Sequence, residues 1–204
     1  MVGTSQILLA DAMPLDTPMT QPFYTIGHST RSISEFVSLL QSAGVTFVAD
    51  VRTVPRSRTN PQYNSDTLTR SLAEFQVGYE HIASLGGLRG RSCEVPSEVN
   101  AFWENESFHN YADYAMGETF RGGLTRLGEL APTQRCAIMC AEAVWWRCHR
   151  RIITDYLIIE GKKVFHILRP GQIDAATMTG AAQSGPSGAL IYPSGLCSPG
   201  RPEI

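Results

Sequence analysis

The stretch VTFVADVR, residues 45–52, decides the fold of this chain. Its first seven residues are nearly all apolar, which is typical of a strand covered on both faces of a parallel sheet. Parallel neighbours need crossover connections, and helical patterns do alternate with β-rich runs on either side of this stretch. The sequence therefore predicts an α/β protein in which 45–51 is a central strand, with Asp50 and Arg52 at its carboxyl end.

The remaining elements are predicted from hydrophobic periodicity. We expect further strands at 23–26, 78–82, 135–140 and 163–168, and helices at 33–44, 66–75, 108–130 and 147–160. The first helix has the clearest start, because Ser32 and Glu35 have the spacing of a capping box. The third helical pattern is interrupted near Gly122 and Gly123. The expected architecture is a Rossmann-like three-layer sandwich, with a mainly parallel sheet of about five strands flanked by helices.

Length and composition favour one domain with two irregular ends. A chain of 204 residues, 43% of them hydrophobic, can bury one sizeable core. Residues 1–21 contain prolines and lack a sustained period, so we expect an N-terminal arm. Residues 171–204 are rich in Gly, Ser, Ala and Pro, which predicts a flexible C-terminal tail. The α/β domain is then expected at 22–170, with a long functional loop at 85–106.

Charge and cysteine content exclude some classes of protein. A formal net charge of -2 argues against a surface devoted to nucleic acid or anionic lipid. The longest apolar run near the start, Ile7 to Ala10, is too short to span a bilayer, so no membrane association is expected. The 5 cysteines form an odd set without a paired framework, which favours reduced thiols and a cytoplasmic location.

Polar and ionisable residues follow three of the predicted strands. In an open parallel sheet, ligands bind beyond the carboxyl ends of the strands, so these three loops are expected to form one site. The predicted catalytic residues are His28, Cys140, Glu142 and His149. The predicted substrate-binding residues are Ser29, Asp50, Arg52, Arg56, Cys148 and Arg150.

The same loops carry several short motifs in a recognisable order. These are YTIGHST at 24–30, DVRTVPRSR at 50–58, LGGLRG at 85–90, FHNYADYAM at 108–116, CAE at 140–142 and CHR at 148–150. On these motifs the chain resembles domain-of-unknown-function family 488 from about Phe23 to Leu168. The resemblance implies a fold and a set of motifs, and it implies no named activity.

Each candidate residue also has a structural interpretation. His28 can act as a general acid or base, or it can simply tie its loop. Asp50 can hold Arg52 toward an anion, or the two can form a purely structural ion pair. Cys140 can become a nucleophile if a helix N-terminus or a nearby cation lowers its pKa, whereas buried cysteines usually only pack. We expect the helix dipoles to favour a thiolate at Cys140.

Metal and phosphate motifs are incomplete in this sequence. Cys140, Glu142, Cys148 and His149 are potential ligands, but their spacing matches no closed zinc motif, so a metal site is the less favoured interpretation. The spacing from Cys140 to Arg147 misses the C-x5-R phosphate cradle of cysteine phosphatases and rhodanese-like enzymes. The sequence identifies no cofactor.

Three functional hypotheses remain. The first is an enzyme, a hydrolase or transferase, that acts on a phosphate-bearing or nucleotide-like substrate and binds an anion near Arg52 and Arg150. The second is a nucleic-acid-binding module that uses arginines, Arg89 among them, for phosphates and tryptophans for bases. The third is a non-catalytic interaction protein, and the tryptophans and the apolar tail residues also suit a homodimer.

Overall fold

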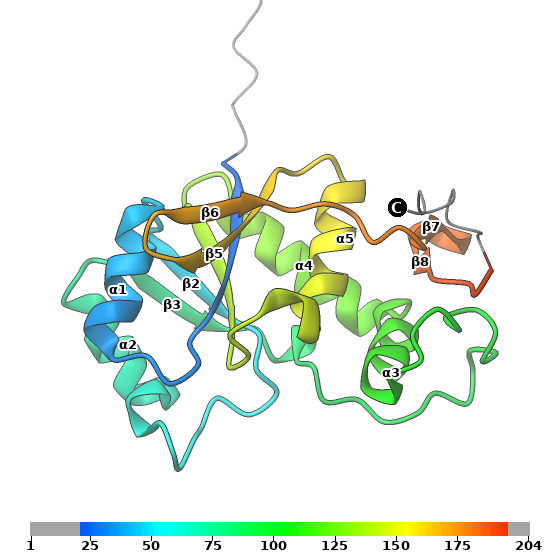
Figure 1. The fold of residues 1–204 in the computed structure, drawn as a ribbon, viewed down its shortest axis with the longest axis horizontal. Helices are drawn as coiled ribbons and strands as arrows, with labels where there is room; N and C mark the ends of the chain where they lie inside the picture. Colours follow the sequence, from blue (N-terminus) through cyan, green and yellow to red (C-terminus); the bar gives the residue numbers. More distant parts are fainter. Residues whose placement is uncertain (1–20, 196–204) are drawn as a thin grey trace, which may run out of the picture.

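The computed structural model describes residues 21–195, and a six-stranded sheet runs through its centre (Figure 1). Residues 1–20 of the predicted arm and 196–204 of the predicted tail lie outside this description. The strands are β1 (Phe23–Gly27), β2 (Phe47–Asp50), β3 (Gly78–His81), β4 (Cys136–Cys140), β5 (Val164–Arg169) and β6 (Gln172–Ala175). Their order is β3-β2-β4-β1-β5-β6, and every pairing is parallel except that of β6 with β5. The predicted α/β fold with a mainly parallel sheet is confirmed.

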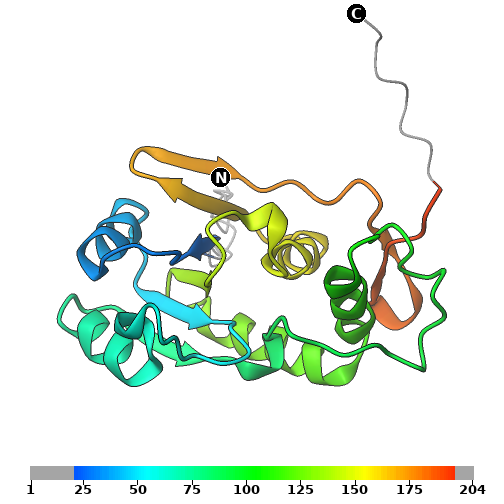
Figure 2. The ribbon, with the colours of Figure 1, turned by 60° about the horizontal axis from the view of Figure 1, so that its bottom comes forward.

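Residues 21–195 contain five α-helices. They are α1 (Ile33–Ser42), α2 (Ser65–Ala73), α3 (Glu106–Ala115), α4 (Glu118–Leu130) and α5 (Arg150–Ile159). Helices α1 and α2 enclose one hydrophobic core, and α3, α4 and α5 enclose the other on the opposite face (Figure 2). This arrangement confirms the three-layer prediction. Within residues 21–195, no helix has the length and hydropathy needed to cross a membrane.

Short 3₁₀ helices and a small hairpin complete the described chain. They are η1 (Pro61–Tyr63), η2 (Ala83–Leu85), η3 (Trp145–Arg147), η4 (Pro186–Gly188), β7 (Gln183–Ser184) and β8 (Leu190–Ile191). The predicted loop at 85–106 contains no α-helix or strand between η2 and α3. It therefore runs along the domain as irregular backbone, as expected.

Helix α1 begins with the predicted capping box. The backbone N–H of Glu35 donates to the side-chain oxygen of Ser32, and the backbone N–H of Ser32 donates to the Glu35 carboxylate. Just beyond the helix, Gly44 adopts a φ of +63°, a left-handed conformation that glycine tolerates without a Cβ clash.

The break between α3 and α4 differs from the prediction. The helix ends at Ala115 and restarts after Gly117, while Gly122 and Gly123 lie inside α4. A Cβ added to Gly123 would lie 2.6 Å from Ser84 Oγ, so this glycine lets α4 approach η2 closely. The prediction of a helix break was wrong. Gly123 is needed for close packing between α4 and η2, and it does not interrupt the helix.

The described chain after residue 170 forms strands and places a few side chains in the core. Strand β6 extends the sheet, and the side chains of Leu190 and Tyr192 are 1% and 0% exposed against α3 to α5. The prediction of a flexible tail at 171–204 is therefore wrong for this part. The segment has few large apolar residues, but backbone hydrogen bonds between strands do not depend on apolar side chains. The large apolar side chains of Leu190 and Tyr192 are fully buried in the core.

His166 is a buried histidine of β5 with an incompletely satisfied ring. Its Nδ1 lies 2.7 Å from the Thr25 hydroxyl, and its ring stacks on Trp145 at 4.2 Å between centroids. Its Nε2 has no hydrogen-bond partner among residues 21–195. Burial, together with the charge of Arg150 and against the opposing effect of Asp174, lowers the pKa of His166 to about 4.

We expect His166 to reduce stability in acid. Between pH 6.5 and about 4 the unfolded chain binds a proton at this residue and the folded chain does not, so stability decreases as the pH falls. The full effect approaches about 3 kcal/mol. In urea titrations, the stability advantage of wild type over His166→Gln should shrink across this window. A constant difference would contradict the buried neutral state.

Candidate functional site

A cavity of about 640 Å³ opens at the carboxyl ends of β1, β2 and β4. Strand β4 lies between β1 and β2, and its connection leads to α5, whereas those of β1 and β2 lead to α1 and α2 on the opposite face. Such diverging connections open a crevice at the strand ends. Seven of the predicted residues line it: His28, Ser29, Arg52, Arg56, Cys140, Glu142 and His149.

The other three predicted residues lie behind or beside the cavity. Asp50 is 0% exposed and Arg150 is 1% exposed, and neither lines the cavity. Cys148 lines a smaller adjoining pocket of about 140 Å³, together with Glu142 and His149. The three predicted loops therefore do meet, but Asp50 and Arg150 can act only through neighbouring groups.

Asp50 and Arg52 form a buried, multiply bonded ion pair. The Arg52 Nε donates to Asp50 Oδ1 at 2.9 Å, and Nη2 donates to Asp50 Oδ2 at 2.6 Å and to the Tyr63 carbonyl at 2.7 Å. The Tyr79 hydroxyl donates to Asp50 Oδ2 at 2.7 Å. Burial opposes the charge on Arg52, but Asp50 outweighs that effect and raises the Arg52 pKa. The guanidinium is thus fixed at the wall of the cavity, and its Nη1 is bonded to neither Asp50 nor Tyr63.

His28 presents an unprotonated nitrogen beside that Nη1. Its Nδ1 lies 2.8 Å from the Ser29 carbonyl, which can only accept, so Nδ1 carries the proton and Nε2 accepts the hydrogen bond from Arg52 Nη1. Nε2 lies 3.4 Å from Arg52 Nη1, and the ring stacks on Tyr63 at 4.0 Å. Burial lowers the pKa of His28 to about 4, against the hydrogen bond to Ser29. Ser29 itself has a φ of +51°, a strained conformation of the kind that clusters at functional sites.

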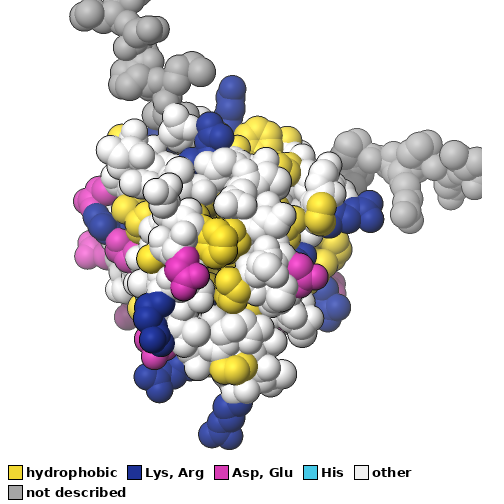
Figure 3. Space-filling view, turned by 90° about the vertical axis from the view of Figure 1, so that its left-hand side faces the viewer, with side chains coloured by type: hydrophobic (Ala, Val, Ile, Leu, Met, Phe, Trp, Pro, Cys, Tyr) yellow, Lys and Arg dark blue, Asp and Glu magenta, His cyan; other side chains and the backbone are white. Residues whose placement is uncertain are grey.

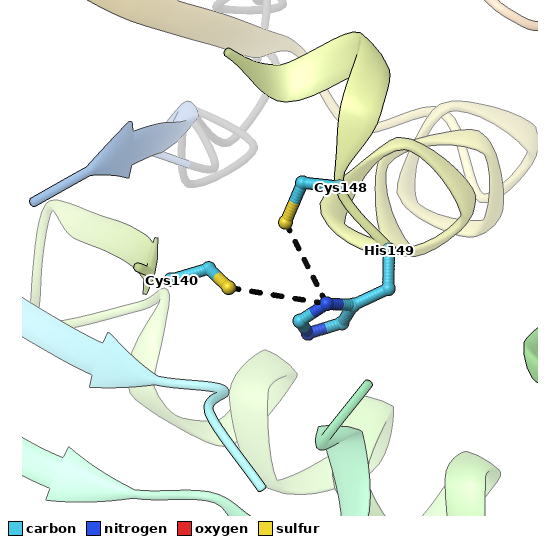
Figure 4. Close-up of side chains that lie close together, drawn as sticks. All are labelled: Cys140, Cys148 and His149. Atoms are coloured by element: carbon cyan, nitrogen blue, oxygen red, sulfur yellow. Dashed lines mark hydrogen bonds between the residues drawn. The ribbon is translucent and has the colours of Figure 1, made fainter. Parts of the chain in front are cut away.

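Two thiols and an imidazole converge at the wall of the cavity (Figure 4). Cys140 ends β4, whereas Cys148 and His149 precede α5. The His149 Nδ1 lies 3.9 Å from Cys140 Sγ and 3.5 Å from Cys148 Sγ. On the other side of the ring, Nε2 lies 2.9 Å from the Val51 carbonyl, so Nε2 carries the proton and Nδ1 turns its lone pair toward the sulfurs.

The electrostatic environment favours a thiolate at Cys148 and not at Cys140. Burial opposes ionisation of Cys148, but the hydrogen bond from Cys140 and the charge of Arg150 outweigh it and lower the Cys148 pKa well below its usual value. The same hydrogen bond, with burial, raises the pKa of Cys140. The predicted thiolate at Cys140 is therefore corrected, because the Arg150 guanidinium is aimed at the other sulfur.

Arg150 is a buried cation without a carboxylate partner among the described residues. Its Nε donates to Cys148 Sγ at 3.3 Å, and its Nη2 donates to the Glu142 carbonyl. Because Arg150 is buried and does not line the cavity, its guanidinium cannot contact an anion there directly. The predicted anion contact at Arg150 does not match this placement, although its charge still acts on the cluster.

Two glycines of the site owe their identity to close contacts. A Cβ on Gly27 would lie 1.9 Å from the Glu142 carbonyl oxygen, and one on Gly87 would lie 2.3 Å from His149 Nδ1. Sequence reasoning missed Gly87, although the adjacent pair in LGGLRG, inside a predicted functional loop, was a signal for such a close approach.

The residues expected to contact nucleic acid are mostly engaged elsewhere. Arg89 donates to the Gly86 carbonyl at 2.8 Å and lies over the Tyr114 ring. Trp103 is 6% exposed, and Trp145 stacks on His166. On the side of α1 and α2, Lys and Arg side chains are scattered among acidic and apolar ones without a continuous basic patch (Figure 3).

Comparison with known proteins gives one match. A family model described as "Domain of unknown function DUF488" matches residues 32–157, which include β2, β3, β4 and the thiol cluster. No curated protein and no solved structure matches the chain.

Proposed function

The chain belongs to the DUF488 family, whose description assigns no activity, and from its cavity we propose that it is an enzyme acting on a phosphate-bearing or nucleotide-like substrate. Its reaction class is that of a hydrolase or transferase. The observation that carries the proposal is the Arg52 guanidinium, which Asp50 fixes through Nε and Nη2 in the lining of the cavity. A pre-oriented guanidinium is a strong phosphate ligand, because little rotamer entropy is lost on binding.

Size and lining support the same class of substrate. About 640 Å³ is within the range of small-molecule sites, roughly 300–1,000 Å³. Arg56 adds a second cation at the rim, and Ser29 and Asn60 add polar groups. Val54 and Leu88 are 61% and 78% exposed at the mouth, where they can cover the apolar part of a nucleotide-like molecule.

Several groups in the lining can carry chemistry. His28 Nε2 can accept a proton, since its tautomer is fixed by Ser29. Glu142 is an exposed carboxylate of the same cavity, and Cys140 and His149 form part of its wall. We propose this enzymatic role over nucleic-acid binding because most of the arginines and tryptophans predicted to contact nucleic acid are bonded or buried. Of that set, Arg56 and Trp146 are exposed.

We also propose that the protein works in a reducing compartment, the cytoplasm. Cys140 and Cys148 are free and lie within 4.8 Å of one another and of His149, so an oxidising environment would join or modify them.

Phosphate binding tests the proposal. We expect inorganic phosphate and a nucleoside monophosphate to bind chelator-treated protein in calorimetry, and Arg52→Lys to weaken binding at least about tenfold, because lysine keeps the charge but loses the planar fork. The exposed rim residue Arg56 should contribute less, about two- to fivefold in Arg56→Ala.

Arg58 supplies the matched control. It is exposed two residues beyond Arg56 but does not line the cavity, so Arg58→Ala should bind phosphate as wild type does. Release of phosphate from a panel of phosphomonoesters and nucleotides then tests catalysis. Absent binding, or equal losses in Arg56→Ala and Arg58→Ala, would overturn the assigned anion site.

A further inference from the structure

We propose that Cys140, Cys148 and His149 bind a thiophilic divalent metal ion, Zn²⁺ in the first instance, with one coordination position open to the cavity. The three side chains come from the end of β4 and the start of α5, and both sulfurs point toward the same imidazole nitrogen (Figure 4). A site with three protein ligands and one open position is the arrangement of catalytic zinc, and a Cys₂His set is among its known forms.

The distances between the donor atoms fit one metal ion. Tetrahedral zinc with bonds of about 2.3 Å to sulfur and about 2.05 Å to nitrogen places these ligand atoms about 3.6 Å apart. The observed separations from His149 Nδ1 are 3.5 Å to Cys148 Sγ and 3.9 Å to Cys140 Sγ. All three donor atoms lie within 4.8 Å of one another, so small side-chain adjustments suffice to close the site.

The surroundings orient the ligands as a metal requires. The Nε2–H of His149 donates to the Val51 carbonyl at 2.9 Å, which leaves Nδ1 as the coordinating atom. Metal-binding histidines almost always donate their other N–H in this way. Gly87 lies directly beside His149 Nδ1, where any Cβ would collide with the imidazole ring. Arg150 Nε–H donates to Cys148 Sγ at 3.3 Å, a bond that a coordinated thiolate retains as an acceptor.

The charge of the assembled site defines what occupies the open position. Two thiolates, a neutral imidazole and a divalent ion sum to zero, and the buried Arg150, without a carboxylate partner in residues 21–195, adds one positive charge. An anionic oxygen balances that charge. Cys140 and His149 line the large cavity, so the open position faces the space assigned to the phosphate-bearing substrate.

The donor set also selects the class of metal. Thiolate and imidazole favour zinc and other soft or borderline ions over magnesium and calcium, which prefer oxygen. Cys140 and Cys148 are only 6% and 3% exposed, which disfavours an ion that keeps its hydration shell. The irregular sequence spacing, which matches no closed zinc motif, does not exclude this open, three-ligand site.

Metal binding is independent of the proposed function, and only the nature of the fourth ligand rests on it. The test uses the full chain, stripped with a chelator under reducing conditions. Titration with Zn²⁺ against a chromophoric chelator should show roughly one ion per chain. Co²⁺ should give the sulfur-to-metal charge-transfer absorption and visible bands of a tetrahedral site. Mg²⁺ should not compete.

Ligand variants and matched thiol controls complete the test. Cys140→Ser, Cys148→Ser and His149→Ala should each weaken Zn²⁺ binding by more than about 100-fold. Cys136→Ser, in the same strand, and Cys93→Ser, at an exposed thiol, should bind as wild type does. Circular dichroism verifies that each variant is folded. Absence of a stoichiometric ion, a cobalt spectrum without charge transfer, or equal losses in the control variants would each overturn the proposal.

Gly87 provides a test that leaves all three ligands in place. Gly87→Ala should weaken Zn²⁺ binding at least about tenfold by displacing the His149 ring, whereas Gly90→Ala, with open space around the added Cβ, should not. Unchanged binding in Gly87→Ala would overturn His149 as a ligand. Failure of zinc binding with intact phosphate binding would remove this inference alone, and the converse would remove the proposed function alone.

Discussion

Gly27→Ala is expected to lower the free energy of unfolding by about 4 kcal/mol or more, or to prevent folding. The added Cβ would lie 1.9 Å from the Glu142 carbonyl oxygen, 2.7 Å from the Glu142 carbonyl carbon and 2.8 Å from the Ala143 Cα. These are backbone atoms, so no rotamer change can relieve the overlap. The loop after β4 has to move away from β1, and it carries part of the cavity wall with it.

Gly122 supplies the control for this substitution. It is exposed inside α4, and nothing lies within 4 Å of an added Cβ. Gly122→Ala should raise stability by about 0.5–1 kcal/mol, because alanine restricts the unfolded chain and favours helix. Chemical denaturation of both variants measures the contrast. A Gly27→Ala protein as stable as wild type would show that the close packing of β1 on the 141–143 loop is unimportant.

Asp50→Asn is expected to lower the free energy of unfolding by about 3–5 kcal/mol. Asp50 is fully buried and accepts hydrogen bonds from Arg52 and from Tyr79. The amide leaves the guanidinium buried without a counter-charge. The same change should weaken phosphate binding, because Arg52 is no longer held in place at the wall of the cavity.

Two further variants distinguish a loss of stability caused by a buried unpaired charge from one caused by disturbed packing. Glu80→Gln removes one carboxylate partner of Arg126, which is 47% exposed, and should change stability far less. Asp50→Asn combined with Arg52→Gln should be more stable than Asp50→Asn alone, because no unpaired charge stays buried. If the double variant is less stable than the single one, the loss arises from packing and not from charge.

The parallel sheet was predictable because a strand buried on both faces has a continuous apolar sequence, which can be recognised within a short segment. The apolar run at 45–51, the capping box of Ser32 with Glu35, and the alternation of strand and helix patterns all lie within short segments. Topological rules then place the three polar loops at one edge. The sequence therefore identified seven residues of the cavity lining, His28 and His149 among them, as candidate site residues.

Long-range contacts were not predictable in the same way. The insertion of Tyr192 into the core depends on partners far along the chain, so a Gly- and Ser-rich composition concealed it. Strand β6, by contrast, pairs with the preceding strand β5 across the turn at Pro170 and Gly171. Likewise, a glycine inside α4 looks like a helix break until its contact with η2 is known.

By itself, the sequence determined the α/β fold and which loops carry the ionisable groups, because periodicity and strand-end position are local properties. Only the tertiary structure decided what those groups do to one another. It paired Arg150 with Cys148 and not with an anion, fixed Arg52 on Asp50, and brought the two sulfurs of Cys140 and Cys148 within 4.8 Å of each other and of an imidazole nitrogen. Hydrogen bonds and electrostatic interactions act over a few ångströms in space, and spacing along the chain does not specify them.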